Sequence, residues 1–107
     1  MRHQVNAYSP IARMAPRRLR DDAEQIVAER FAVCEAQLQA MGAAPHGPQG
    51  FNPRDRRGIR QASVKQLRQN VRQRRYGSLG MTVLFWILGA IVEWAIKRWL
   101  EKRFPDR

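Results

Sequence analysis

The residues best suited to chemistry form a basic run between Arg54 and Arg75. Guanidinium and ammonium groups bind phosphates, whether these belong to nucleic-acid backbones or to anionic lipid headgroups. The run contains no aromatic residue before Tyr76, which counts against stacking on single-stranded bases. We expect contact with anionic lipid first and with nucleic acid second; the alternative is a purely topology-determining role. The candidate contact residues are Arg60, Lys65, Arg68, Arg72, Arg74 and Arg75.

The whole chain is strongly basic, with a formal net charge of +11 over 107 residues. The charge is uneven, because residues 21–42 hold five acids and one Arg, whereas residues 43–76 hold nine basic residues and one acid. Such a balance points to polyanionic partners. The length allows one small domain at most.

Other reactive residue types are present but isolated. Cys34 is the one cysteine, so no internal disulfide can form, and we interpret it as an apolar member of a helix stripe. His3 and His46 lie far apart without further ligands at metal-binding spacing. The sequence holds neither a phosphate loop with Lys nor a Ser/His/Asp or Cys/His set. We therefore expect no cofactor, no metal site and no enzymatic activity.

Two predicted helices would position the basic run. The first covers residues 21–41, has acids in its first turn and carries an apolar stripe at spacings of four and three. Gly42 offers this helix a left-handed stop. The second covers residues 53–75, with Asn52 as its cap. Their opposite net charges favour an antiparallel hairpin across the linker at 43–52.

The strongest structural signal is the apolar segment 79–96, where Glu93 is the one charged residue. A helix of this length rises about 27 Å, close to the roughly 30 Å hydrocarbon core of a bilayer. Nine Leu, Ile, Phe and Val residues favour insertion by roughly 3–5 kcal/mol, more than the off-centre Glu93 costs. The segment therefore predicts a transmembrane helix. Its expected membrane-spanning residues are Leu79, Val83, Leu84, Phe85, Trp86, Ile87, Leu88, Ile91, Val92 and Ile96.

Aromatic and basic residues flank this segment, as is typical of membrane spans. The predicted interface anchors are Tyr76, Trp94, Trp99, Lys97 and Arg98. Seven basic residues precede the segment within about 20 positions and five follow it, which predicts a cytoplasmic N-terminus and a tail-anchored, single-pass protein. One alternative is a helix that enters the bilayer only partly. Another is a core helix covered by a partner protein, because the rest of this chain is too polar to cover it.

The expected fold class is all-α, with a flexible basic N-terminal tail, a short helical hairpin and one C-terminal transmembrane helix. The predicted segments are a flexible basic tail (1–19), an acidic amphipathic helix (20–42), a Pro/Gly linker (43–52), a basic juxtamembrane helix (53–76), a transmembrane helix (77–100) and a short basic tail (101–107).

This architecture leads us to expect a small membrane protein with a structural or accessory role. Examples are a subunit of a membrane complex and a membrane component of a bacterial virus. Its expected partners are a bilayer with anionic headgroups and other proteins of such a complex. The alternatives are a holin-like pore-forming lysis protein and a membrane-tethered nucleic-acid-binding protein.

Overall fold

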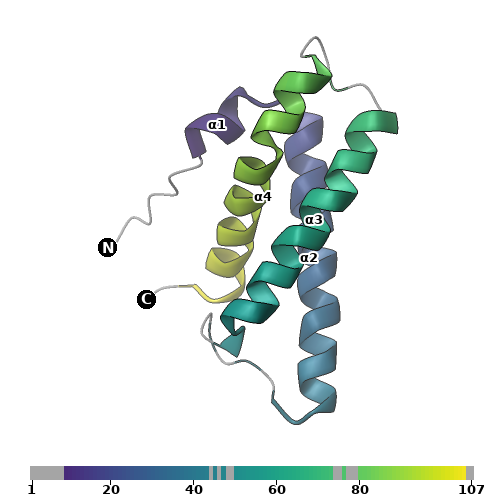
Figure 1. Cartoon of the computed structure of the whole chain (residues 1–107). Helices are drawn as coiled ribbons and strands as arrows, with labels where there is room; N and C mark the ends of the chain where they lie inside the picture. Colours follow the sequence, from purple (N-terminus) through teal and green to yellow (C-terminus); the bar gives the residue numbers. More distant parts are fainter. Residues whose placement is uncertain are drawn as a thin grey trace.

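The computed structural model describes residues 9–43, 45, 47, 50–73, 76 and 80–105, and the regular elements within these ranges are helices. In chain order they are α1 (Ser9–Met14), α2 (Arg17–Ala40), α3 (Pro53–Gln73) and α4 (Met81–Arg103). The three long helices pack on one another as a bundle, and α1 packs against α4 near its start (Figure 1). The all-α prediction is confirmed.

Helix α3 begins with a side-chain cap and buries one face. Oδ1 of Asn52 accepts the backbone N–H of Asp55 at 2.8 Å, which satisfies one of the donors that a helix start leaves without a partner. Buried residues then recur every four positions, at Ile59, Ser63, Leu67 and Val71. A spacing of four keeps them on one side of the helix, so the opposite side faces outward.

Helix α2 ends in a left-handed turn at Gly42, as the sequence predicts. Gly42 has a φ of 74°, and its N–H donates to the carbonyl of Gln39 at 3.0 Å. The N–H of Ala43 donates to the carbonyl of Leu38 at 2.8 Å. These two bonds form a Schellman motif, which satisfies carbonyl groups that a helix end otherwise leaves unpaired.

Helix α4 is the element around which the core is built. It contacts α1, α2 and α3, and its buried side chains include Leu88, Ile91 and Val92. Matching apolar stripes come from α2 and α3, in which Phe31 and Leu67 are fully buried. Apolar surface removed from water stabilises by about 25 cal/mol per Å², so the mutual burial of these stripes holds the long helices together.

The transmembrane prediction is wrong. Across the described parts of the chain, no helix combines the length and the apolar character that a bilayer crossing needs. The apolar segment is not a helix of its own, because α4 starts at Met81 and runs on through Lys97 and Arg98 to Arg103. The predicted single-pass topology, tail anchor and membrane localisation are therefore wrong as well.

The physical reason is that α2 and α3 are polar overall but each keeps an apolar stripe, and these stripes cover α4. Phe85 and Ile87 are half-buried, Val83 and Trp86 are exposed, and Leu79 lies outside the described residues. The other predicted membrane-spanning residues are buried in the core of the bundle: Leu84, Leu88, Ile91, Val92 and Ile96.

Two of the predicted interface anchors, the buried Tyr76 and the half-buried Trp99, contact residues of α2. Tyr76 is 2% exposed, and its hydroxyl donates to Oδ2 of Asp22 on α2 at 2.5 Å. Trp99 stacks on Phe31 with ring centroids 4.0 Å apart and planes 4° apart. Lys97, by contrast, is exposed on α4. Rings that were expected at a headgroup layer thus join α2 to the rest of the chain.

The predicted flexible N-terminal tail is partly helical. Helix α1 occupies Ser9–Met14 and α2 begins at Arg17, while residues 1–8 lie outside the described chain. Pro10 lies in the first turn of α1 and Pro16 precedes α2 directly. Proline is tolerated at helix starts because the N–H groups of the first turn have no acceptor within the helix, so proline loses no hydrogen bond there. The prolines therefore mark helix starts here, not an irregular tail.

Candidate polyanion-binding face

The outward side of α3 carries a line of cations. We define the outer basic face as Arg54, Arg57, Lys65, Arg68 and Arg72, all of which are exposed. Their spacings of three, eight, three and four residues keep them within roughly 80° of arc, given 3.6 residues per turn. From first to last they extend about 27 Å along the helix axis. The line exists because the buried stripe of α3 fixes which side of the helix meets solvent.

No acidic residue lies on the outer basic face. Asp55 is the acid of α3, and it sits in the first turn with its Oδ2 buried. Gln61 and Gln69 are exposed between the cations, and their amides add hydrogen-bond donors to the same face. No member of the face forms an ion pair with any other residue that the structure describes. The face therefore presents unneutralised positive charge.

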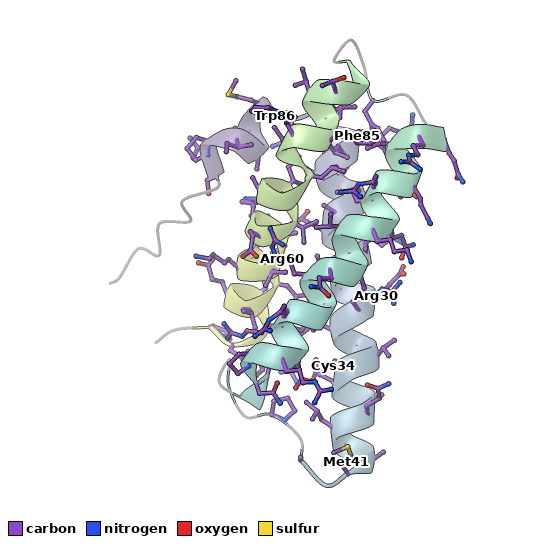
Figure 2. The ribbon with its side chains drawn as sticks, viewed as in Figure 1. Arg30, Cys34, Met41, Arg60, Phe85 and Trp86 are labelled. Carbon is purple, nitrogen blue, oxygen red and sulfur yellow. The ribbon has the colours of Figure 1, made fainter. Side chains whose placement is uncertain are left out.

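Arg60, a predicted contact residue, is turned towards α4. Its Nε lies 2.6 Å from Oε1 of Glu93, and this ion pair bridges α3 and α4. Its guanidinium also covers Gly89, where an added Cβ would lie 3.1 Å from Nη2. Figure 2 shows Arg60 reaching across from α3 to α4. Arg60 therefore joins two helices, and its charge is neutralised within the bundle.

The other predicted contact residues divide into two groups. Lys65, Arg68 and Arg72 belong to the outer basic face. Arg74 and Arg75 lie outside the described residues. The structure adds Arg54 and Arg57, which the prediction omitted although they belong to the same basic run. Helical rotation of 100° per residue would have aligned them with the other three.

Other arginines are used to tie α4 to α2. Glu24 pairs with Arg98, and Oε2 of Glu35 lies 3.2 Å from Nη2 of Arg103. The Arg98 guanidinium also lies 5.6 Å from the ring centroid of the half-buried Trp94. The acids of α2 thus meet cations of α4, and none of these pairs involves the outer basic face of α3.

One aromatic residue of α4, Phe85, lies at the C-terminal end of the outer basic face. The Arg72 guanidinium lies over the ring of Phe85, 5.8 Å from its centroid. Trp86 comes next in the chain and is 86% exposed. In Figure 2, Phe85 lies beside α3, and Trp86 lies on the side of α4 towards α1. The basic run itself has no aromatic residue before Tyr76, and folding places Phe85 from a different helix beside it.

The one cysteine is part of the packing. Burial raises the pKa of the Cys34 thiol above its ordinary value of 9.0, and the charges of Asp55 and Glu35 raise it further. The thiol therefore stays protonated near neutral pH, which is the less nucleophilic form. Its buried position on α2 agrees with the interpretation of Cys34 as a small apolar residue.

A groove of about 350 Å³ lies between α2 and α4. Its lining includes Asp21 and Glu24 from α2, and Arg98 and Lys102 from α4. Because Glu24 and Arg98 pair with each other, the groove presents charges of both signs and no strong preference for either. Over the described residues, no group of three His, Cys, Asp or Glu side chains is placed to hold a metal ion.

The outer basic face is thus the described surface with the clearest chemical preference. Its arginines, lysine and glutamine amides can all donate hydrogen bonds to phosphate oxygens, and the arginines can do so in pairs. Comparisons of this chain with protein-family models, with curated proteins and with solved structures find no match.

Proposed function

We propose that this protein binds nucleic acid through the outer basic face of α3. The supporting observation is a line of exposed, unpaired cations about 27 Å long. One strand of a B-form duplex carries a phosphate about every 3.4 Å, so about eight phosphates fall within that length. Each cation that approaches a phosphate releases condensed counterions, which favours binding of the chain to the strand.

The composition of the face favours nucleic acid over a lipid surface. Helices that dock on membranes insert apolar side chains between the lipids. The outer basic face has none to insert, because Gly58, Gln61 and Gln69 are the exposed residues among its cations. The apolar side of α3, which includes Leu67 and Val71, is buried in the bundle. A phosphodiester backbone needs only cations and hydrogen-bond donors, and the face supplies both.

Fluorescence anisotropy with labelled oligonucleotides of about twenty nucleotides, single-stranded and duplex, tests the proposal. Between about 50 mM and about 200 mM salt, we expect the logarithm of the affinity to fall linearly with the logarithm of the salt concentration. Five phosphate contacts predict a slope of about −3.5 for a single strand and about −4.5 for a duplex. Arg68→Gln and Arg72→Gln should each weaken binding and reduce the slope by about 0.7–0.9.

Arg30→Gln is the matched control. Arg30 is exposed on α2 and donates to Oε1 of Gln66 at 3.1 Å, so its loss removes the same charge from a different helix. Absence of binding at the lowest salt contradicts the proposal, as does an equal effect of Arg30→Gln and Arg68→Gln. Binding to phosphatidylserine vesicles without binding to nucleic acid would assign the face to anionic lipid instead.

A further inference from the structure

Trp86 is exposed far beyond what a core helix requires. It leaves 86% of its surface open to solvent, and Val83, one turn earlier on the same side of α4, is 49% exposed. Scattered exposed apolar residues are ordinary, but a bare tryptophan ring next to a valine forms a flat apolar platform. Two cations lie near this end of α4: Arg72 contacts Phe85, the residue before Trp86, and Arg13 is exposed on α1, which packs against α4.

The contact between Arg72 and Phe85 connects the platform to the outer basic face. The guanidinium lies 5.8 Å from the Phe85 centroid, so the last cation of the face is held against the first turns of α4. Successive helix residues diverge by about 100°, so Phe85 faces α3 while Trp86 projects into solvent (Figure 2). A flexible strand that continues from Arg72 around the first turns of α4 reaches Trp86, the residue that follows Phe85 in the chain.

We infer that the outer basic face takes single-stranded nucleic acid in preference to duplex, with one base stacked on Trp86. This inference rests on the function proposed above and specifies its ligand. Single-strand sites combine a line of cations along the backbone with aromatic rings on which bases stack. In a duplex the bases are already stacked and paired, so Trp86 has no free base face to contact.

The test compares Trp86→Ala and Trp86→Phe, using a labelled single strand of about twenty thymidines and a mixed-sequence duplex of the same length. We expect Trp86→Ala to weaken single-strand binding about five- to hundredfold and to leave duplex binding unchanged. Trp86→Phe should retain most of the affinity, because a phenyl ring still stacks. Single-strand binding should quench tryptophan fluorescence in the native protein, and Trp86→Phe should abolish that quenching while Trp94 and Trp99 still fluoresce.

The outcomes separate this inference from the proposed function. If Arg68→Gln weakens binding but Trp86→Ala does not, the basic face binds nucleic acid and the stacking inference fails. Equal affinity for single strand and duplex also overturns it. If no nucleic acid binds, both the proposed function and this inference fail. Dimerisation that Trp86→Ala abolishes would then identify a second copy of the chain as the ligand of the platform. A blue shift of tryptophan fluorescence with anionic vesicles alone would identify lipid. Thermal unfolding should match the native protein, because Trp86 is almost fully exposed.

Discussion

Among single residues, Ser63 is the polar side chain most deeply buried in the described core. It is 0% exposed on the inner side of α3, and its Oγ has no hydrogen-bond partner among the residues that the structure describes. A buried hydroxyl without a partner costs about 1–3 kcal/mol in lost hydration. Ser63 belongs to the buried stripe of α3, which packs against α2 and α4.

Replacement of Ser63 by Ala should therefore stabilise the bundle. Ser63→Ala removes the unpaired hydroxyl and improves helix propensity, so we expect the free energy of unfolding to rise by about 1 kcal/mol. Ser63→Leu should lower it by about 1–3 kcal/mol through overpacking. Urea unfolding followed by circular dichroism measures both. Gln69→Ala, on the exposed side of α3, controls for propensity alone, and an equal gain there would contradict the role of the hydroxyl.

The buried thiol of Cys34 makes stability depend on pH in the alkaline range. Burial, with the charges of Asp55 and Glu35, raises the pKa of Cys34 above 9.0 in the folded state. The unfolded chain therefore releases this proton first, and the contribution of Cys34 is complete below pH 9.0 and is lost as pH rises through the folded pKa. Unfolding free energies measured from neutral pH upward should decline less in Cys34→Ala than in the native protein. Parallel curves for the two proteins would refute this.

Two glycines contribute to helix stability in opposite ways: Gly42 ends α2 in a left-handed conformation, and Gly58 lies inside α3, where glycine is a poor helix former. Gly42 holds a φ of 74° at the end of α2, where an added Cβ would meet nothing within 4 Å, so only the backbone conformation disfavours Ala there. Gly58 lies inside α3 and is equally free of steric contact. Gly42→Ala should lower the free energy of unfolding by about 1–2 kcal/mol. Gly58→Ala should raise it by about 0.5–1 kcal/mol. Thermal and urea unfolding measure the pair, and changes of the same sign would contradict the assignment.

Local signals predicted the start of α3 and the end of α2, but not the start of α2, which lies at Arg17 and has no acid in its first turn. Asn52 and Gly42 act within a few residues of themselves, so the start of α3 and the end of α2 follow from the sequence. The apolar run of α4 has the same composition whether lipid or protein covers it. Whether lipid or protein covers α4 depends on whether the apolar stripes of other helices, such as those containing Phe31 and Leu67, can bury it. The residue pattern of α4 alone contains no information on those stripes.

In the candidate site, too, helical spacing predicted some features, and others depend on packing between helices. Lys65, Arg68 and Arg72 follow from helical spacing, because they share one side of one helix. The ion pair between Arg60 and Glu93 and the placement of Phe85 against Arg72 both depend on how α3 packs on α4. Packing between helices thus determines which cations stay free and which aromatic residues border them.

Considered as a whole, the molecule aligns five exposed cations, without ion-pair partners in the described chain, along one side of α3. With a net charge of +11, the folded state is subject to self-repulsion. The repulsion is locally strongest at Arg68, which has Lys65 three residues before it and Arg72 four residues after it on the same face. Each such like-charged pair destabilises a helix by about 0.2–0.5 kcal/mol. A line of cations that weakens its own helix is expected where the line binds a polyanion, since stability and function then oppose each other.

Arg68→Gln should therefore make the free protein more stable while it weakens binding to nucleic acid. Removal of two like-charged pairs predicts a gain of about 0.4–1 kcal/mol at low ionic strength. The gain should shrink between about 10 mM and about 150 mM salt, as the Debye length falls from about 30 Å to about 8 Å. Arg103→Gln, which breaks the pair with Glu35, should instead destabilise by at most about 1 kcal/mol. Urea unfolding at both salt concentrations measures these differences. If Arg68→Gln destabilised the protein, or acted equally at both, the cations of α3 would not be under mutual repulsion, and their alignment would no longer point to a polyanionic ligand.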